Sequence, residues 1–188
     1  MNNLKYTLFD LFVYTLPGAL LLFSGYVVYF GNDKHFSSQT IGSIFSNLNI
    51  YEAAIFIIFS YCCGFVCSII GYYFWRLKEL FFPIFKKDEE PKSKSKKFAT
   101  VRELSKENFK YIEQWNVLKN FASALSVVLL VIDFLFFYQY NGFPVICFLI
   151  GMILSILILF QASNYHRWAL IDLDNAYQFC LQEQSKQS

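Results

Sequence analysis

The sequence predicts an all-α integral membrane protein: a four-helix transmembrane bundle whose helices extend into a small cytoplasmic helical bundle. Three observations predict this fold class: a high apolar content, four long apolar stretches, and a concentration of basic residues between the second and third stretches. The 188 residues are 56% hydrophobic and only 16% charged, which lies outside the range of ordinary soluble domains. A net charge of +2 is too small to favour nucleic acid as a direct partner.

Four stretches are long enough to span a bilayer, whose hydrocarbon core of about 30 Å needs roughly 20 apolar helical residues. They cover about residues 8–30, 51–74, 121–140 and 143–163. Each is expected to be helical, because backbone groups in lipid must be satisfied within the segment. The first is too long for a signal peptide and contains Asp10 and Pro17.

Two local signals shape the spans. Pro17-Gly18 predicts a kink in the first span, because proline removes one backbone hydrogen bond. Asn141-Gly142 predicts a tight turn that makes the third and fourth spans an antiparallel hairpin.

The distribution of Lys and Arg predicts the topology. Twelve of them lie between the second and third spans, whereas the loops after the first and third spans together hold only Lys34. Because positive residues stay in the cytoplasm, both termini are expected there. The expected organisation is two spans in residues 1–74, a cytoplasmic region in 75–118, two spans in 119–163, and a cytoplasmic helix and tail in 164–188.

The cytoplasmic region is expected to begin with two more turns of the second helix, which Pro83 ends. The charged run 86–97 has no apolar residue and predicts a flexible linker, with contact to anionic lipid as the alternative. Thr100 and Glu103 have capping-box spacing, and this predicts one unbroken helix from about Val101 to Tyr140.

The C-terminal segment 164–183 has an apolar periodicity typical of an amphipathic helix. Its predicted face is centred on Trp168, Ile171, Asn175 and Phe179, and is broadened by Leu170, Leu173, Tyr177 and Leu181. We expect this face to pack against the apolar stripe of residues 100–118, which would complete the cytoplasmic bundle.

Three acidic residues lie in or beside the predicted spans. Asp133 is past the midplane of the third span, where a carboxylate is costly and commonly functional. The alternative is a protonated Asp133 hydrogen-bonded to Ser24, Ser60 or a neighbouring subunit. Asp10 and Glu52 lie within about a turn of the predicted interfaces, where they can reach headgroup water.

Small residues recur along two spans at a spacing that lets helix backbones approach closely. They are Ser60, Gly64, Ser68 and Gly71 in the second span, and Gly151 and Ser155 in the fourth. We expect them to pack helices within or between subunits, and a homo-oligomer is favoured.

The sequence offers no recognisable catalytic chemistry. It holds no nucleophile-base-acid set, phosphate-binding loop or metal-ligand spacing. The Cys62-Cys63-x-x-x-Cys67 cluster has no nearby histidine. We therefore expect neither an enzyme nor a bound cofactor or metal.

Three segments carry a resemblance to a known family: LFDLFVYTLPG (8–18), YIEQWNVLKNFASA (111–124) and RWALIDLDNAYQF (167–179). They resemble the small four-span membrane proteins of bacterial anti-phage operons, in particular the membrane subunit family of the Kiwa system. The resemblance implies a homo-oligomer of the bacterial inner membrane, a tetramer, that docks a soluble DNA-binding effector on its cytoplasmic face. The chain is also similar in outline to the four-span effector of the Hailong system, a pore held closed by a nucleotide ligand, and this would make Asp133 a channel element.

The main hypothesis is therefore a membrane sensor and scaffold for anti-phage defence that recruits a soluble effector. Its predicted contact residues are Arg102, Lys110, Trp115, Arg167 and Asp174. The alternative hypothesis is an oligomeric pore that depolarises the membrane on infection. A transporter is disfavoured, because the four spans show no inverted repeat or second broken helix.

Overall fold

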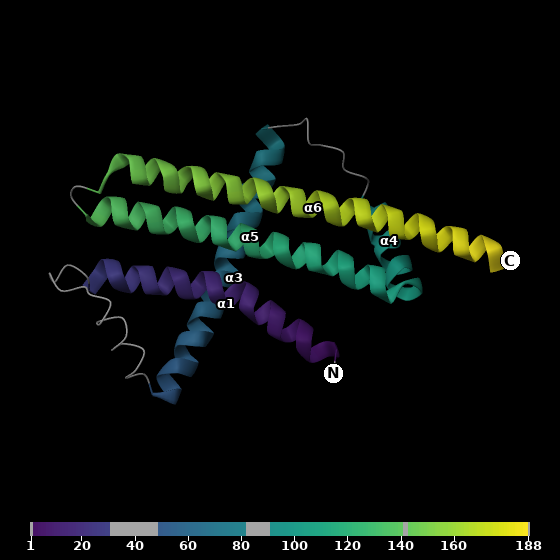
Figure 1. Cartoon of the computed structure of the whole chain (residues 1–188), viewed down its shortest axis with the longest axis horizontal. Helices are drawn as coiled ribbons and strands as arrows, with labels where there is room; N and C mark the ends of the chain where they lie inside the picture. Colours follow the sequence, from purple (N-terminus) through teal and green to yellow (C-terminus); the bar gives the residue numbers. More distant parts are fainter. Residues whose placement is uncertain (1, 31–48, 82–90, 141–142, 188) are drawn as a thin grey trace.

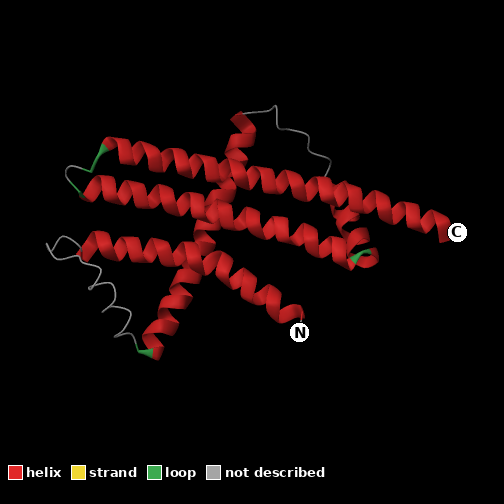
Figure 2. Ribbon diagram, viewed as in Figure 1, coloured by secondary structure: helices red, strands yellow, loops and turns green. Residues whose placement is uncertain are grey.

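The computed structural model describes residues 2–30, 49–81, 91–140 and 143–187, and all regular structure in this part of the chain is helical. In chain order the helices are α1 (Asn2–Phe30), α3 (Ile50–Phe81), α4 (Pro91–Leu104), α5 (Lys106–Gln139) and α6 (Val145–Gln187) (Figures 1 and 2). The all-α fold class predicted from the sequence is confirmed.

Four of these helices, α1, α3, α5 and α6, are long and apolar enough to cross a membrane, and each contains one predicted apolar stretch. They fit a membrane protein. At 34 and 43 residues, α5 and α6 are about 51 and 65 Å long, whereas the hydrocarbon core is only about 30 Å thick. Each is therefore longer than a bilayer core requires, by about 20 Å for α5 and about 35 Å for α6.

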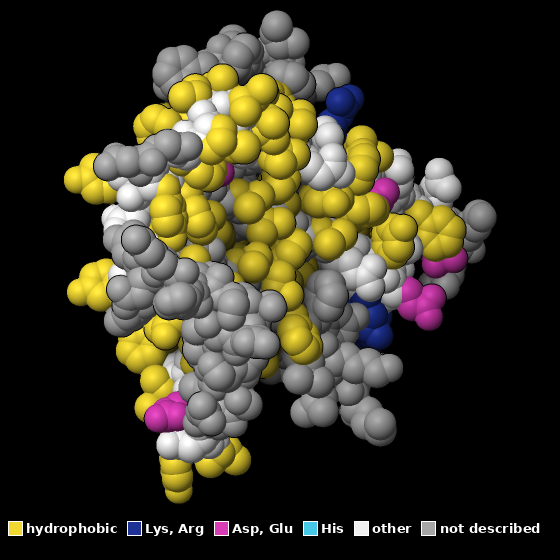
Figure 3. Space-filling view, turned by 60° about the vertical axis from the view of Figure 1, so that its left-hand side comes forward, with side chains coloured by type: hydrophobic (Ala, Val, Ile, Leu, Met, Phe, Trp, Pro, Cys, Tyr) yellow, Lys and Arg dark blue, Asp and Glu magenta, His cyan; other side chains and the backbone are white. Residues whose placement is uncertain are grey.

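The helices form an apolar half, which contains the four apolar stretches, and a polar half at the other end of α5 and α6. In Figure 1, α5 and α6 run side by side along the whole molecule, α1 lies beside α5 at the apolar end, and α4 passes behind α6 at the other end. The α3 helix crosses α1 and α5 steeply. Figure 3 views the apolar end, where hydrophobic side chains cover most of the described surface.

Close helix crossings in the apolar half depend on the predicted small residues. A Cβ atom added at Gly64 would overlap the Tyr14 carbonyl of α1, and one added at Gly18 would overlap the Ser60 carbonyl of α3. Two turns farther along the same face of α3, a Cβ at Gly71 would collide with Ser123 of α5. α3 therefore touches its neighbours backbone to backbone, and these contacts are made within one chain.

The remaining small residues complete this packing. Ser68 is buried, and Gly151 and Ser155 of α6 face α5: Gly151 packs on Asp133, while the Ser155 carbonyl accepts a 2.8 Å hydrogen bond from Ser126 Oγ. Whether such faces also join subunits stays a prediction. α1 passes through Pro17 as one helix and bends where it meets α3 in Figure 1.

The predicted flexible linker and single long helix are wrong in the described residues. Residues 91–97 belong to α4, which begins at Pro91, a first-turn position where proline's missing N–H has no helical partner to lose. Thr100 lies inside this helix and donates its hydroxyl to the Lys96 carbonyl, 3.0 Å away. The helix is interrupted at Ser105, whose φ of −139° and ψ of 81° are not helical. A new helix, α5, therefore begins at Lys106.

Other predictions about connections lie outside the described residues. These are the loop over 31–48, the stop at Pro83, the linker residues 86–90, and the turn at Asn141-Gly142. The predicted two-turn continuation of the second helix is confirmed, because α3 runs on to Phe81.

Candidate partner-binding surface on the polar bundle

The polar half is a three-helix unit with its own core. We call it the polar bundle, made of α4, residues 106–118 of α5 and residues 164–187 of α6. Its buried core consists of Val101, Ile112, Ala169, Leu173 and Ala176, with Phe98, Phe109, Trp115 and Tyr177 packed around them. This core is separate from that of the apolar half, which is built on Cys67, Ala124, Val127 and Val128.

An aromatic cluster occupies the polar bundle where it meets the apolar half. Trp115 stacks on Tyr165 at 5.9 Å between ring centroids and meets Trp168 edge-on at 5.1 Å. The Trp115 Nε1 donates a 2.7 Å hydrogen bond to Asp172 Oδ2. Trp115 therefore joins α5 to α6 and is half-buried by these contacts, and its role as a partner-contact residue stays a prediction.

A salt bridge attaches α4 to α6. Lys97 Nζ lies 2.7 Å from Asp174 Oδ1 and 6.0 Å from the centre of the Tyr177 ring. The Lys97 side chain is only 15% exposed, whereas that of Asp174 is 49% exposed. Asp174, predicted as a partner contact, is thus at the surface but already paired within the chain.

The buried face of the C-terminal helix differs from the predicted one. Ala169, Leu173, Ala176 and Cys180 are buried, and they recur at the helical spacing of three and four residues. The predicted centre of the face lies to one side: Trp168 is 40% exposed, Ile171 47% and Phe179 51%. Three of these four buried residues are small, which lets α6 approach its neighbours closely, and Trp168, Ile171 and Phe179 are left at the surface.

A cavity of about 260 Å³ lies beside this exposed face. Asn108, Tyr111 and Ile112 of α5 line one wall, and Asp172, Asn175 and Phe179 of α6 line the other. The lining combines an apolar floor with amide, hydroxyl and carboxylate groups. Sequence reasoning missed this site, although the exposed aromatic at Phe179 and the amide at Asn175 lie on the periodic face that it identified.

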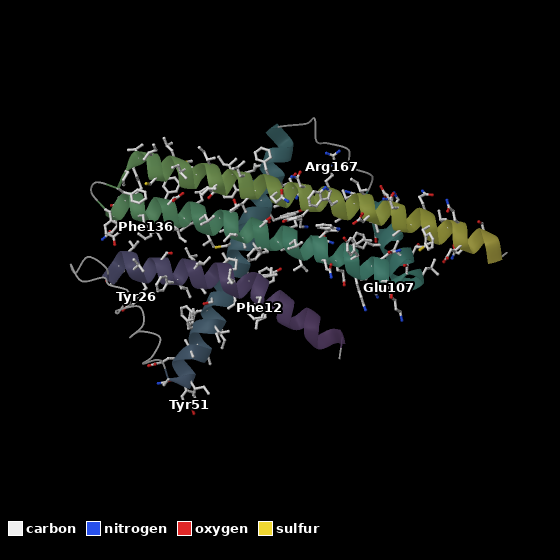
Figure 4. All side chains as sticks on the ribbon, viewed as in Figure 1. Phe12, Tyr26, Tyr51, Glu107, Phe136 and Arg167 are labelled. Carbon is white, nitrogen blue, oxygen red and sulfur yellow. The ribbon has the colours of Figure 1, made fainter. Side chains whose placement is uncertain are left out.

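The remaining predicted contact residues lie apart from the cavity. Arg102 and Arg167 are exposed and Lys110 is partly exposed, and none of the three lines the cavity. In Figure 4, Arg167 projects from the side of α6 that faces away from α5. The structure therefore does not bring the predicted cations together into one site.

Asp133 lies in the apolar half, where α5 packs on α6. Its carboxylate fills the space over Gly151, and Oδ2 is buried without a hydrogen-bond partner among the described residues. The predicted alternative of a bond to Ser60 is not formed, because Ser60 Oγ is itself buried and unpartnered in the described part of the chain. The described residues form no bond between Asp133 and Ser24 either.

Glu52 caps the start of α3 together with Asn49, three residues before it in the sequence. Asn49 Oδ1 accepts hydrogen bonds from the Tyr51 and Glu52 amides, and Glu52 Oε2 accepts one from the Asn49 amide, each at 2.9 Å. This is a capping box at the start of α3. Asp10 belongs to α1, and its side chain lies outside the described residues.

Across the described ranges, no group of three His, Cys, Asp or Glu side chains is placed to hold a metal ion. The cavity of the polar bundle offers apolar contact, hydrogen-bonding groups and one carboxylate, that of Asp172. Comparison with known protein families, with curated proteins and with solved structures finds no match.

Proposed function

We propose that this chain is a membrane-anchored scaffold whose polar bundle recruits a soluble partner protein at the cytoplasmic face. The observation that carries the proposal is the continuity of α5 and α6, each a single helix from the apolar half into a polar bundle with its own core. An anchor alone would not need these extensions. A packed bundle on rigid helices is suited to holding a partner at a fixed distance from the bilayer.

The charge distribution supports the cytoplasmic orientation. The polar bundle carries the Lys-rich start of α4 and the basic residues at the beginning of α5, whereas the opposite ends of the helices have few cations. Under the positive-inside rule this end stays in the cytoplasm, which also puts both termini there.

The biological setting that we propose is anti-phage defence at the bacterial inner membrane. It rests on the resemblance of residues 8–18, 111–124 and 167–179 to the Kiwa membrane subunit family. On this proposal the chain is a homo-oligomer, a tetramer, its partner is a soluble DNA-binding effector, and the membrane half senses infection.

The test is co-purification of the full-length tagged protein in mild detergent from cells that express the neighbouring genes. A Leu173→Asp variant opens the core of the polar bundle, and Leu181→Asp places the same charge at a 40% exposed position of the same helix. We expect one soluble operon protein to co-purify with the wild type and with Leu181→Asp, and to be lost with Leu173→Asp. If the soluble protein co-purifies equally with the wild type and both variants, or with none of them, the scaffold proposal is refuted.

A pore is the second candidate, and one observation favours it: the buried, unpartnered Asp133 Oδ2 at the α5–α6 contact. A carboxylate in a membrane segment is a frequent element of an ion pathway. Cells that express the wild type or Asp133→Asn are compared with a potential-sensitive dye, before and during infection. A pore predicts depolarisation that Asp133→Asn reduces, and an unchanged potential in both states excludes it.

A further inference from the structure

We propose that the cavity side of the polar bundle binds an amphipathic helix of the partner, with a Lys or Arg side chain paired to Asp172. We call this surface the α5–α6 groove and define it by Tyr111, Ile112, Asp172, Asn175 and Phe179. The inference rests on the proposed scaffold function, because the partner supplies the helix.

The first argument is the exposure of large apolar side chains outside the membrane. Phe179 lies about 24 Å along α6 from Ser163, where the fourth apolar stretch ends, and Tyr111 lies about 15 Å along α5 from Phe121, where the third begins. Lipid tails do not cover side chains at those distances. Tyr111 on α5 is 56% exposed and Phe179 on α6 is 51% exposed, so both walls of the groove present aromatic surface to water. Contiguous surface of this kind marks interaction sites.

The second argument is that the polar bundle has one flank that α4 occupies and, within the described ranges, one flank that is open. Asp174 faces α4 through its salt bridge with Lys97, whereas Asp172 lines the groove. Two positions on a helix two residues apart point about 200° from each other. A helix in the groove would therefore lie opposite α4 and complete a four-helix arrangement.

The third argument is the chemistry of the lining. Among the described residues Asp172 has one hydrogen-bond partner, Trp115, which uses Oδ2. Its negative charge has no cation beside it there. Asn108 and Asn175 add neutral amides at the rim. The partner that complements this lining carries apolar anchors at helical spacing and one basic side chain.

The size of the cavity favours a side chain over a small ligand. Its volume of about 260 Å³ falls below the roughly 300–1,000 Å³ that is usual for small-molecule sites. This volume is sufficient for one apolar side chain of a bound helix.

Charge also argues against a second copy of this chain as the occupant. Two copies that met through the same groove would place two Asp172 carboxylates in one contact whose described lining holds no basic side chain to pair with them, and uncompensated like charges disfavour an interface. A partner helix that carries a Lys or Arg side chain would instead neutralise the negative charge of Asp172.

The binding experiment uses full-length protein in phosphatidylcholine nanodiscs and two fluorescent helical peptides of about 18 residues. The peptides share the same leucines at positions i, i+3, i+4 and i+7 and differ only in a central Lys or Glu. Fluorescence anisotropy gives their dissociation constants. We expect the Lys peptide to bind roughly tenfold more tightly than the Glu peptide, and Phe179→Ser to weaken both.

Asp172→Asn and Asp174→Asn form the matched pair of variants. Asparagine at 172 keeps an oxygen that accepts the Trp115 Nε1 hydrogen while it removes the charge, so the fold is retained. We expect Asp172→Asn to abolish the preference for Lys and Asp174→Asn to leave it intact. Equal binding of both peptides to the wild type, or the same preference in both variants, would overturn the proposal.

A photo-crosslinking amino acid in place of Phe179, with Leu181 as the control position, identifies the occupant in cells. The proposal predicts a crosslink from position 179 to a basic amphipathic helix of the co-purifying protein, and none from position 181. A crosslink only to a second copy would overturn it. If the partner co-purifies but is not crosslinked from 179, the groove is wrong and the scaffold stands; if no partner co-purifies, the scaffold itself fails.

Discussion

Glycine at the crossing of α1 and α3 sets how closely these helices approach. Gly64 packs on the Tyr14 carbonyl and Gly18 on the Ser60 carbonyl, so neither position has room for a methyl group. Gly25, farther along α1, has nothing within 4 Å of a Cβ added there. The same substitution is therefore expected to have opposite effects at the two kinds of site.

We predict that Gly64→Ala lowers the thermal stability of the detergent-solubilised protein, because the methyl group forces α1 and α3 apart at a cost of about 1–3 kcal/mol. Gly25→Ala is the control and is expected to be neutral or to stabilise α1 by up to about 1 kcal/mol. Thermal unfolding followed by circular dichroism measures both. Equal melting temperatures for Gly64→Ala and Gly25→Ala would contradict the described crossing.

Trp115 gives a second prediction at this scale. Trp115→Phe keeps a ring in the cluster but removes the Nε1 hydrogen bond to the Asp172 carboxylate, and the loss of a hydrogen bond to a charged group costs about 1.5–3 kcal/mol. Burial raises the pKa of the nearby bundle residue Cys180, and the Glu183 carboxylate raises it further, so this thiol should react slowly with a maleimide while the polar bundle is closed.

We expect Trp115→Phe to speed Cys180 labelling and Trp168→Phe to change it little, because in the described structure Trp168 makes ring contacts but no hydrogen bond. Mass spectrometry of the peptide that contains Cys180 gives the rate. An unchanged rate in Trp115→Phe would show that its bond to Asp172 does not hold the polar bundle together.

The small-residue positions could be predicted because their spacing is local. The Trp115–Asp172 bond could not, because its partners are 57 residues apart and each has several polar neighbours in the sequence. The groove was missed for a related reason: the periodic face of α6 was visible, but which part of it α5 buries depends on how closely the two helices approach.

Among the elements, α4 shows how tertiary contacts override composition. Its Lys- and Ser-rich first half has little to bury, yet fully buried Val101 and the pair of Lys97 with Asp174 attach it to α5 and α6. The composition of residues 86–97 alone predicts a flexible linker, because it does not contain these tertiary contacts.

The continuity of α6 can be tested at Asn164, an exposed residue at the boundary between its two halves. Asn164→Pro removes a backbone hydrogen bond and should cost about 3 kcal/mol or more in the helix interior, whereas Asn164→Ala should have little effect. We expect Asn164→Pro to stay in the membrane fraction but to lose the co-purifying partner and to expose Cys180 to maleimide. If the partner still co-purifies with Asn164→Pro, the polar bundle binds it without a rigid helical connection to the apolar half.

At the scale of the whole molecule, four helices long and apolar enough to cross a membrane could be predicted, because the length and composition of each segment determine them. Their crossings could not, since the small-residue face of α3, which runs from Ser60 to Gly71, does not indicate where along it α1 and α5 lie. Backbone contacts at Gly64 and Gly71 decide that. The result is one chain with two cores, joined by α5 and α6.

The central claim is that α5 and α6 leave the bilayer on its cytoplasmic side and carry the polar bundle there. Single cysteines at Tyr138, an 88% exposed residue at the other end of α5, and at exposed Gln182 of α6 test it in a background whose native cysteines are alanine. A membrane-impermeant maleimide is expected to label Tyr138→Cys in intact spheroplasts and Gln182→Cys only after permeabilisation. Labelling of Gln182→Cys in intact spheroplasts would contradict the account.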